Sequence, residues 1–134
     1  MYLVVICLLL LAKEGWLDID KDLVAASATP LVLTILEEGE SYGYAILKRV
    51  RELSNGEMEW TDGMLYPLLH RLHRLGLVTH DWRLSPEGRR RRYYAITDEG
   101  RAALEEHKRQ WVAVARTLRD AWGGALPTLA SGSP

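Results

Sequence analysis

The residues whose types and spacing could bind a ligand are arginines gathered in one part of the chain. Residues 66–92 hold seven arginines against two carboxylates, Asp81 and Glu87, which leaves a local charge of +5. The chain as a whole has 134 residues and a net charge of −1. Guanidinium groups contact phosphates and guanine edges, and local fields rather than total charge steer association with DNA. The charge distribution therefore points to nucleic acid, although the overall charge does not.

The first basic stretch, residues 61–76, has the periodicity of one amphipathic helix. Leu65, Leu68, Leu69 and Leu72 recur at helical spacing and share one face with Gly76. A helix with a leucine back, a basic front and a small N-terminus suits the major groove of DNA. A core helix with a solvated charged side is the alternative. The residues expected at DNA are Thr61, which is also a good N-cap, and Gly63, Met64, Tyr66, Pro67, His70, Arg71 and Arg74.

After this helix the period becomes strand-like. Residues 77–84 and 89–96 can form two strands around the turn cluster Ser85 to Gly88, and this hairpin is a wing following a helix-turn-helix. The second strand begins with four consecutive arginines, which could contact phosphates or the minor groove. Because strand residues alternate faces, about two of the four would point at DNA. They are Arg89, Arg90, Arg91 and Arg92.

The remaining elements must position the basic helix and the hairpin. We expect one helix from near Asp18 to a break at Pro30, and a second over residues 31–38. Ser41 is expected to cap the helix that precedes the basic one, and Thr97 begins a last helix that could reach Trp122. The predicted fold is mainly α with a small β-hairpin. It comprises a winged helix-turn-helix domain (18–97), a C-terminal dimerisation helix (98–122), a loose tail (123–134) and an apolar N-terminal extension (1–17).

The last helix carries an apolar seam. Its residues repeat at alternating three- and four-residue spacing, as in a helix that packs on a partner helix. At about 25 residues the helix is roughly 37 Å long, more than this small core can cover, so a homodimer is expected. Trp111 and Trp122 could line a pocket for a small aromatic or drug-like effector, although packing in the dimer core explains them equally well. The dimerisation residues are expected to be Leu104, His107, Trp111, Val114, Leu118 and Trp122.

Other functions find little support in the sequence. It contains no Gly-rich phosphate loop and no nucleophile with a base, so neither an enzyme nor a cofactor is expected. His70 and His73 lie three residues apart and His80 follows, but a metal site needs three or four converging ligands and only two of these share the basic face, so none is expected. Cys7 is the only cysteine, which excludes a disulfide within the chain and fits a cytoplasmic protein. The apolar residues 1–12 are too short to span a bilayer. They could pack on the domain or a partner, arise from an upstream start, or form a weak membrane or targeting element, although a membrane partner is not favoured.

With helix, turn, basic helix, wing and trailing helix in place, the chain resembles the PadR family of bacterial transcriptional regulators over roughly residues 31–122. The resemblance implies a winged helix-turn-helix homodimer that usually represses transcription, whose C-terminal helix contacts the partner, and which in some members senses a small molecule near the dimer interface. The expected partner is double-stranded DNA with an inverted-repeat operator. The alternative is a winged-helix protein–protein interaction module. The resemblance is carried by SYGYAILKRVREL (41–53), TDGMLYPLLHRLHRLGLV (61–78), GRRRRYYAIT (88–97) and DEGRAAL (98–104).

Overall fold

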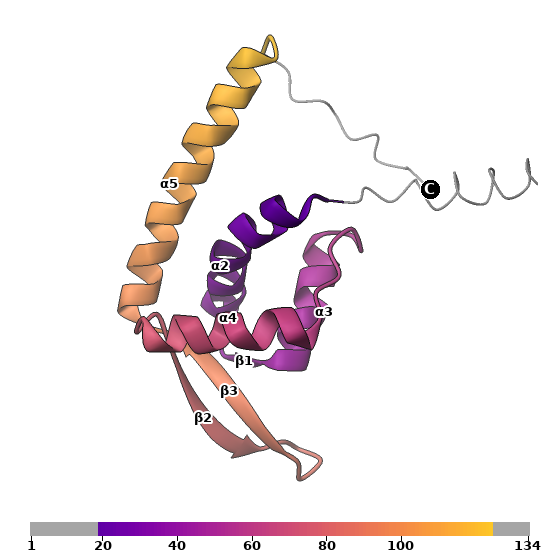
Figure 1. Ribbon diagram of the computed structural model, residues 1–134. Coiled ribbons are helices and arrows are strands. Elements are labelled where there is room, and N and C mark those ends of the chain that lie inside the picture. The colour runs from indigo at the N-terminus through magenta and orange to yellow at the C-terminus, as the bar shows by residue number, and fades with distance from the viewer. Residues whose placement is uncertain (1–18, 125–134) are drawn as a thin grey trace, which may run out of the picture.

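The computed structural model describes residues 19–124, so residues 1–18, with Cys7 and the predicted extension, and residues 125–134 of the predicted tail lie outside the described part. Within the described residues, three helices gather above a small sheet and the longest helix runs away from them (Figure 1). The elements are α2 (Lys21–Glu38), β1 (Ser41–Tyr42), α3 (Gly43–Leu53), α4 (Asp62–Arg74), β2 (Val78–Leu84), β3 (Arg90–Ile96) and α5 (Asp98–Ala121).

The core lies where α2 meets the other helices and the sheet. Leu33 from α2, Ile46 from α3, Leu69 from α4 and Leu104 from α5 are all fully buried in it. The leucine face predicted for α4 is confirmed, because Leu65, Leu69 and Leu72 are also buried and only Leu68 is partly exposed. Burial of these apolar side chains holds the helices together and turns the other side of α4 toward solvent.

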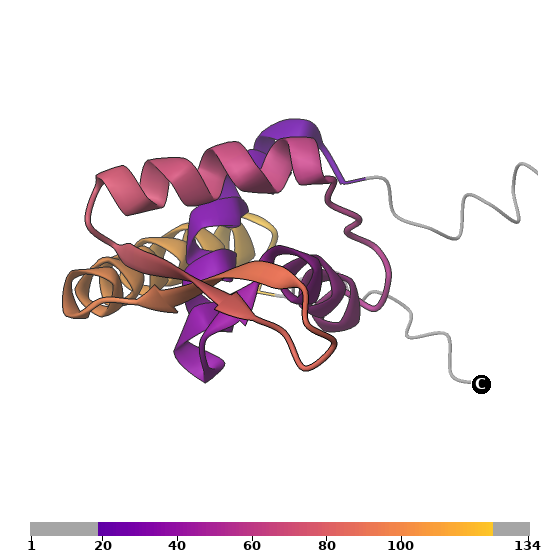
Figure 2. The same cartoon turned by 90° about the horizontal axis from the view of Figure 1, so that it is seen from below.

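Three strands, not two, form the sheet. They are antiparallel in the order β1-β3-β2, so β3 is central. The predicted hairpin is confirmed as β2 and β3, and Figure 2 shows it from below with α4 on one side. The prediction that Ser41 caps α3 is wrong. Ser41 pairs with Tyr94 in β1, and Tyr42 occupies the N-cap position without a side-chain capping bond. Pairing with β3 gives this backbone its hydrogen bonds instead.

The predicted break at Pro30 is also wrong, because α2 continues through it. Pro30 lacks the N–H that would bond one turn back, and the first turns of α2 run obliquely to the rest in Figure 1. Thr34 Oγ1 donates to the Pro30 carbonyl oxygen at 2.7 Å. Residues on both sides of the proline, Ala28 and Val32 among them, are buried in the core. Tertiary packing therefore outweighs the local cost of the proline.

Different interactions define the two ends of α4 and the start of α5. Thr61 stands at the N-cap of α4 as predicted, but its side chain makes no capping bond. Gly76 lies beyond the end of α4, exposed and with a φ of 74°, rather than on the leucine face. The predicted start of α5 is confirmed, since Thr97 Oγ1 accepts a hydrogen bond from the Gly100 N–H at 3.0 Å. The same hydroxyl donates to the Gly76 carbonyl oxygen at 2.7 Å and so joins the two helices.

The long helix α5 leaves most of its seam uncovered in the single chain. Leu104 is buried and His107 and Trp111 are partly covered, whereas Leu118 is 41% and Trp122 55% exposed. The predicted fold class is confirmed: the molecule is a winged helix-turn-helix with a long C-terminal helix. None of the helices within residues 19–124 is both long and apolar enough to cross a membrane.

Candidate nucleic-acid interface

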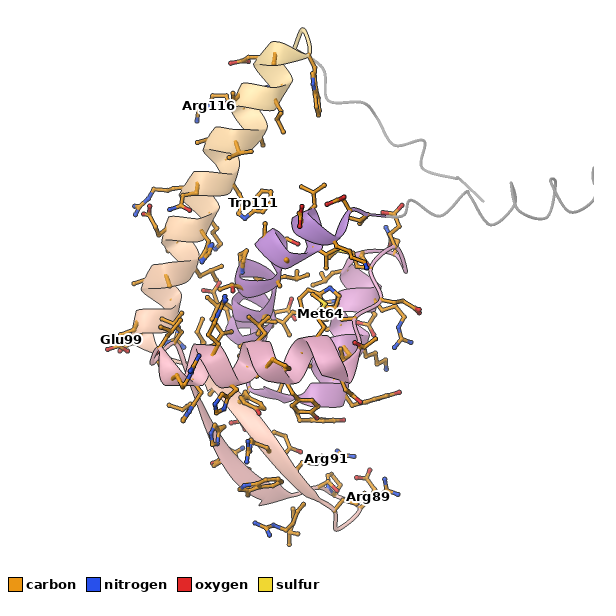
Figure 3. All side chains as sticks on the ribbon, in the orientation of Figure 1. Met64, Arg89, Arg91, Glu99, Trp111 and Arg116 are labelled. Atoms are coloured by element: carbon orange, nitrogen blue, oxygen red, sulfur yellow. The ribbon has the colours of Figure 1, made fainter. Side chains whose placement is uncertain are left out.

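An open groove of about 770 Å³ lies between the β2–β3 hairpin, the start of α3 and the exposed side of α4. Aromatic and cationic side chains line it, a combination that can contact both bases and phosphates. Figure 3 labels Arg89 and Arg91 near the tip of the hairpin. The lining residues are Tyr42, Gly43, Tyr44, Tyr66, Trp82, Arg89, Arg90, Arg91, Arg92 and Tyr94.

The strand register divides the arginines between two faces. Arg90 and Arg92 share the side of β3 that carries the buried Tyr94 and Ile96, and this side faces α4. Arg91 lies on the other side with Tyr93. The register therefore confirms the predicted alternation for Arg90, Arg91 and Arg92, whereas Arg89 lies before the start of β3.

On the side facing α4, two guanidinium groups stack on one indole. The guanidinium carbons of Arg90 and Arg92 lie 5.0 Å and 4.7 Å from the Trp82 ring centre. The Nε of Arg92 is buried without a hydrogen-bond partner in the part of the chain described. Among the same residues no carboxylate forms an ion pair with Arg90 or Arg92. Two positive charges are thus held beside α4 without a counter-charge from the protein.

On the opposite side of the hairpin the arginines are neutralised. Arg91 lies 3.6 Å from a Glu87 carboxylate oxygen and stacks over the Tyr42 ring. Arg83 forms ion pairs with Glu40 and Asp81. The hydrogen bonds that Arg83 donates to Glu40, first, and to Asp81, second, raise the pKa of Arg83. The two faces of one small hairpin therefore differ sharply in available positive charge.

The outer face of α4 is small and polar. Gly63, Pro67, His70 and Arg74 are exposed on it, as predicted. Tyr66 is half-exposed on the flank toward α3, and a Cβ at Gly43 would meet its hydroxyl oxygen at 2.5 Å. Burial first, and the charge of Asp62 second, raise the pKa of Tyr66. The phenol is therefore neutral near pH 7 and can donate to a phosphate.

Two residues predicted at the DNA face lie elsewhere. Met64 is half-buried and packs against the core, between the helices in Figure 3. Arg71 lies on the flank of α4 that faces α2, where its Nη2 donates to Thr29 Oγ1 at 3.3 Å. This bond directs the guanidinium of Arg71 toward α2.

Comparison with known proteins agrees with this geometry. The family model described as "Transcriptional regulator PadR-like family" matches residues 32–106, more than half of the chain. The chain belongs to the PadR-like family. Its members are transcriptional regulators, which are not enzymes.

Individual relatives of this PadR-like regulator are similar over most of the described residues. The transcriptional regulator Rv3488 of Mycobacterium tuberculosis is 40% identical over 83 residues, which are 62% of this chain and 74% of the relative. The crystal structure of a PadR-like transcriptional regulator from Bacillus cereus has 30% identity and a TM-score of 0.69, and the match covers 78% of this chain and 100% of that one. A transcriptional regulator from Clostridium thermocellum has 27% identity and a TM-score of 0.69, with 75% and 97% covered.

Sequence reasoning missed two features of the PadR-like interface. The first is the role of Trp82, because only the strand register places it opposite Arg92. The second is the contact between His73 and His80. Their rings lie 4.1 Å apart, between α4 and β2, and the described residues contain no cluster of three or more metal-ligating side chains.

Proposed function

We propose that this PadR-like regulator binds double-stranded DNA sequence-specifically as a homodimer, and that it represses transcription from an inverted-repeat operator. The proposal rests mainly on the uncompensated charges of Arg90 and Arg92 beside the exposed side of α4. Charges without a protein partner can release counterions from DNA when they meet phosphates. In this arrangement α4 enters the major groove and the hairpin contacts the flanking backbone.

The candidate contacts fall into two groups. Residues of α4 are proposed to approach base edges and phosphates, with Tyr66 and His70 nearest to the hairpin side. Met64 and Arg71 are less favourably placed, for the reasons given above. Arg89, Arg90 and Arg92 are proposed to contact phosphates or the minor groove, and Arg91 to do so only by giving up its ion pair with Glu87. The full candidate set is Thr61, Gly63, Tyr66, Pro67, His70, Arg74, Arg89, Arg90, Arg91 and Arg92.

The homodimer is proposed from α5. Leu118 and Trp122 are large apolar side chains that remain exposed in the single chain, on the same side of the helix as the buried Leu104. Pairing of two α5 helices would cover them and place two α4 helices at successive major grooves, about 34 Å apart. A small aromatic effector between Trp111 and Trp122 and a cytoplasmic location are further parts of this proposal.

The test is DNA binding measured by fluorescence anisotropy across a salt series. The probe is a labelled fragment from upstream of the protein's own gene, and scrambled DNA of equal length serves as the reference. We expect tighter binding to the upstream fragment and a steep salt dependence. The double variant Arg90→Ala/Arg92→Ala should weaken binding and reduce the salt slope by about two, since each phosphate contact contributes roughly one.

A matched double variant controls for charge. Arg109 and Arg116 are exposed on the side of α5 away from the seam, and Figure 3 labels Arg116 there. Arg109→Ala/Arg116→Ala removes the same charge and should leave the salt slope unchanged. Equal, weak binding of the wild-type protein to both fragments, repeated on a genome-wide pool of fragments, would argue against DNA binding and for a protein-interaction module.

A further inference from the structure

The hairpin holds two of its uncompensated arginines, Arg90 and Arg92, with an aromatic ring rather than with acids. Trp82 pairs with Arg92 directly across the β2–β3 ladder. The guanidinium carbon of Arg90 lies 5.0 Å from the centre of the indole ring, and that of Arg92 lies 4.7 Å from it. The Trp82 side chain is itself half-exposed, with 52% of its surface accessible.

A stack and an ion pair restrain an arginine in different ways. A carboxylate fixes the guanidinium but also cancels its charge and occupies its N–H donors. An indole face attracts the cation through the ring quadrupole, and leaves the net charge and the unburied in-plane donors available, which for Arg92 excludes its buried Nε. A long arginine side chain otherwise loses considerable rotamer entropy when it binds a phosphate. A ring beneath it therefore removes part of that cost before DNA arrives.

The same hairpin contains a contrasting case on its other face. The guanidinium carbon of Arg83 lies 5.2 Å from the centre of the Tyr93 ring, but Glu40 and Asp81 also bind this guanidinium. That arginine is fixed and neutralised, so it has little to offer a phosphate. Only the Trp82 side combines restraint with free charge, and it faces the groove beside α4.

We propose that Trp82 is a positioning residue of the DNA interface, which preorganises the guanidinium groups of Arg90 and Arg92 for phosphate contact. The inference rests on the proposed function, since it names what makes the wing arginines effective there. It assigns Trp82 an action through the two arginines, not a contact with DNA of its own.

The experiment is a double-mutant cycle on affinity for the operator fragment. Trp82→Leu removes the ring face but keeps an apolar side chain in the strand. Losing the preordering of two arginine side chains corresponds to a loss of about 5- to 150-fold in affinity. In the Arg90→Ala/Arg92→Ala background the same change should alter affinity by less than about 2-fold, because its effect requires the arginines. Trp82→Tyr, which retains a ring face, should bind within about 3-fold of the wild type.

Tyr93→Leu is the matched control, because it removes an aromatic ring beneath an arginine on the opposite face of the hairpin. It should leave the affinity unchanged once thermal unfolding shows the variant folded. If Trp82→Leu does not fold, the cycle is run with Trp82→Val and Trp82→Thr, which also lack a ring and are common in strands.

The outcomes separate the two proposals. Wild-type protein that binds no DNA in the pool overturns both. Wild-type binding that depends on Arg90 and Arg92 but is unaffected by Trp82→Leu overturns the inference alone. An equal loss in the background without the arginines also overturns it, and would make the indole a direct DNA contact.

Discussion

The imidazole of His80 occupies a position that opposes its protonation. It lies against His73 of α4, and its ring meets Tyr94 edge-on with ring centres 5.7 Å apart. Burial first, and then the charges of His73 and Arg92, lower the pKa of His80 from its usual 6.5. The unfolded chain therefore binds this proton more readily than the folded protein.

The sign of the pH dependence follows from that difference. The contribution of His80 to the free energy of unfolding is fully present above about pH 6.5 and is lost as the pH falls through the lowered pKa. We expect urea unfolding to give lower stability at about pH 5.5 than at about pH 7, above the range in which carboxylates titrate. His80→Gln should flatten this dependence. An identical slope in the variant would mean that other groups control the stability in this range.

At the scale of elements, Thr97 holds together the end of α4 and the start of α5. Its hydroxyl caps α5 and also donates to the Gly76 carbonyl oxygen. Thr97→Val keeps the shape and removes both bonds, so the free energy of unfolding should fall by about 1–2 kcal/mol in chemical denaturation. Thr79→Val is the control, because Thr79 is exposed on β2, and it should change stability by less than about 0.5 kcal/mol.

The elements that could be predicted from sequence are those with local signals. The spacing of the leucines predicts α4. The turn residues around Gly88 predict the hairpin, and Thr97 predicts the start of α5. The strand β1 is two residues long and too short to show a period, and its partner Tyr94 lies far along the chain. Continuity through Pro30 depends on burial of residues on both sides of it, which is tertiary information.

The candidate site was predictable in composition but not in geometry. The run of arginines is visible in the sequence, and alternation along a strand follows from the pleat. Which arginines keep their charge depends on partners such as Glu87, and on the register that puts Trp82 opposite Arg92. The bond from Arg71 to Thr29 joins residues in different helices and has no local signal.

At the scale of the whole molecule, the exposed seam of α5 predicts the state of association. We expect the wild-type protein to sediment as a dimer at micromolar concentration. Leu118→Glu places a charge in the seam and should yield a folded monomer with weaker operator binding, because a buried unpaired charge is costly. Ala113→Glu, on the opposite side of the helix, should remain dimeric. A monomeric wild type would contradict the proposed dimer.

The close packing of Gly100 restricts the orientation of α5. Its backbone lies so close to the Leu77 carbonyl oxygen that a Cβ would overlap it, and this oxygen also accepts from the Thr97 N–H at 3.1 Å. The first turn of α5 therefore cannot rotate independently of the segment that leads out of α4. The 24 residues of α5 form a rod of about 36 Å, so a tilt of about 10° displaces its far end by about 6 Å. In the proposed dimer, the crossing angle of the two rods thus determines the separation of the two α4 helices, and repacking far from DNA would change the half-site spacing that the protein fits.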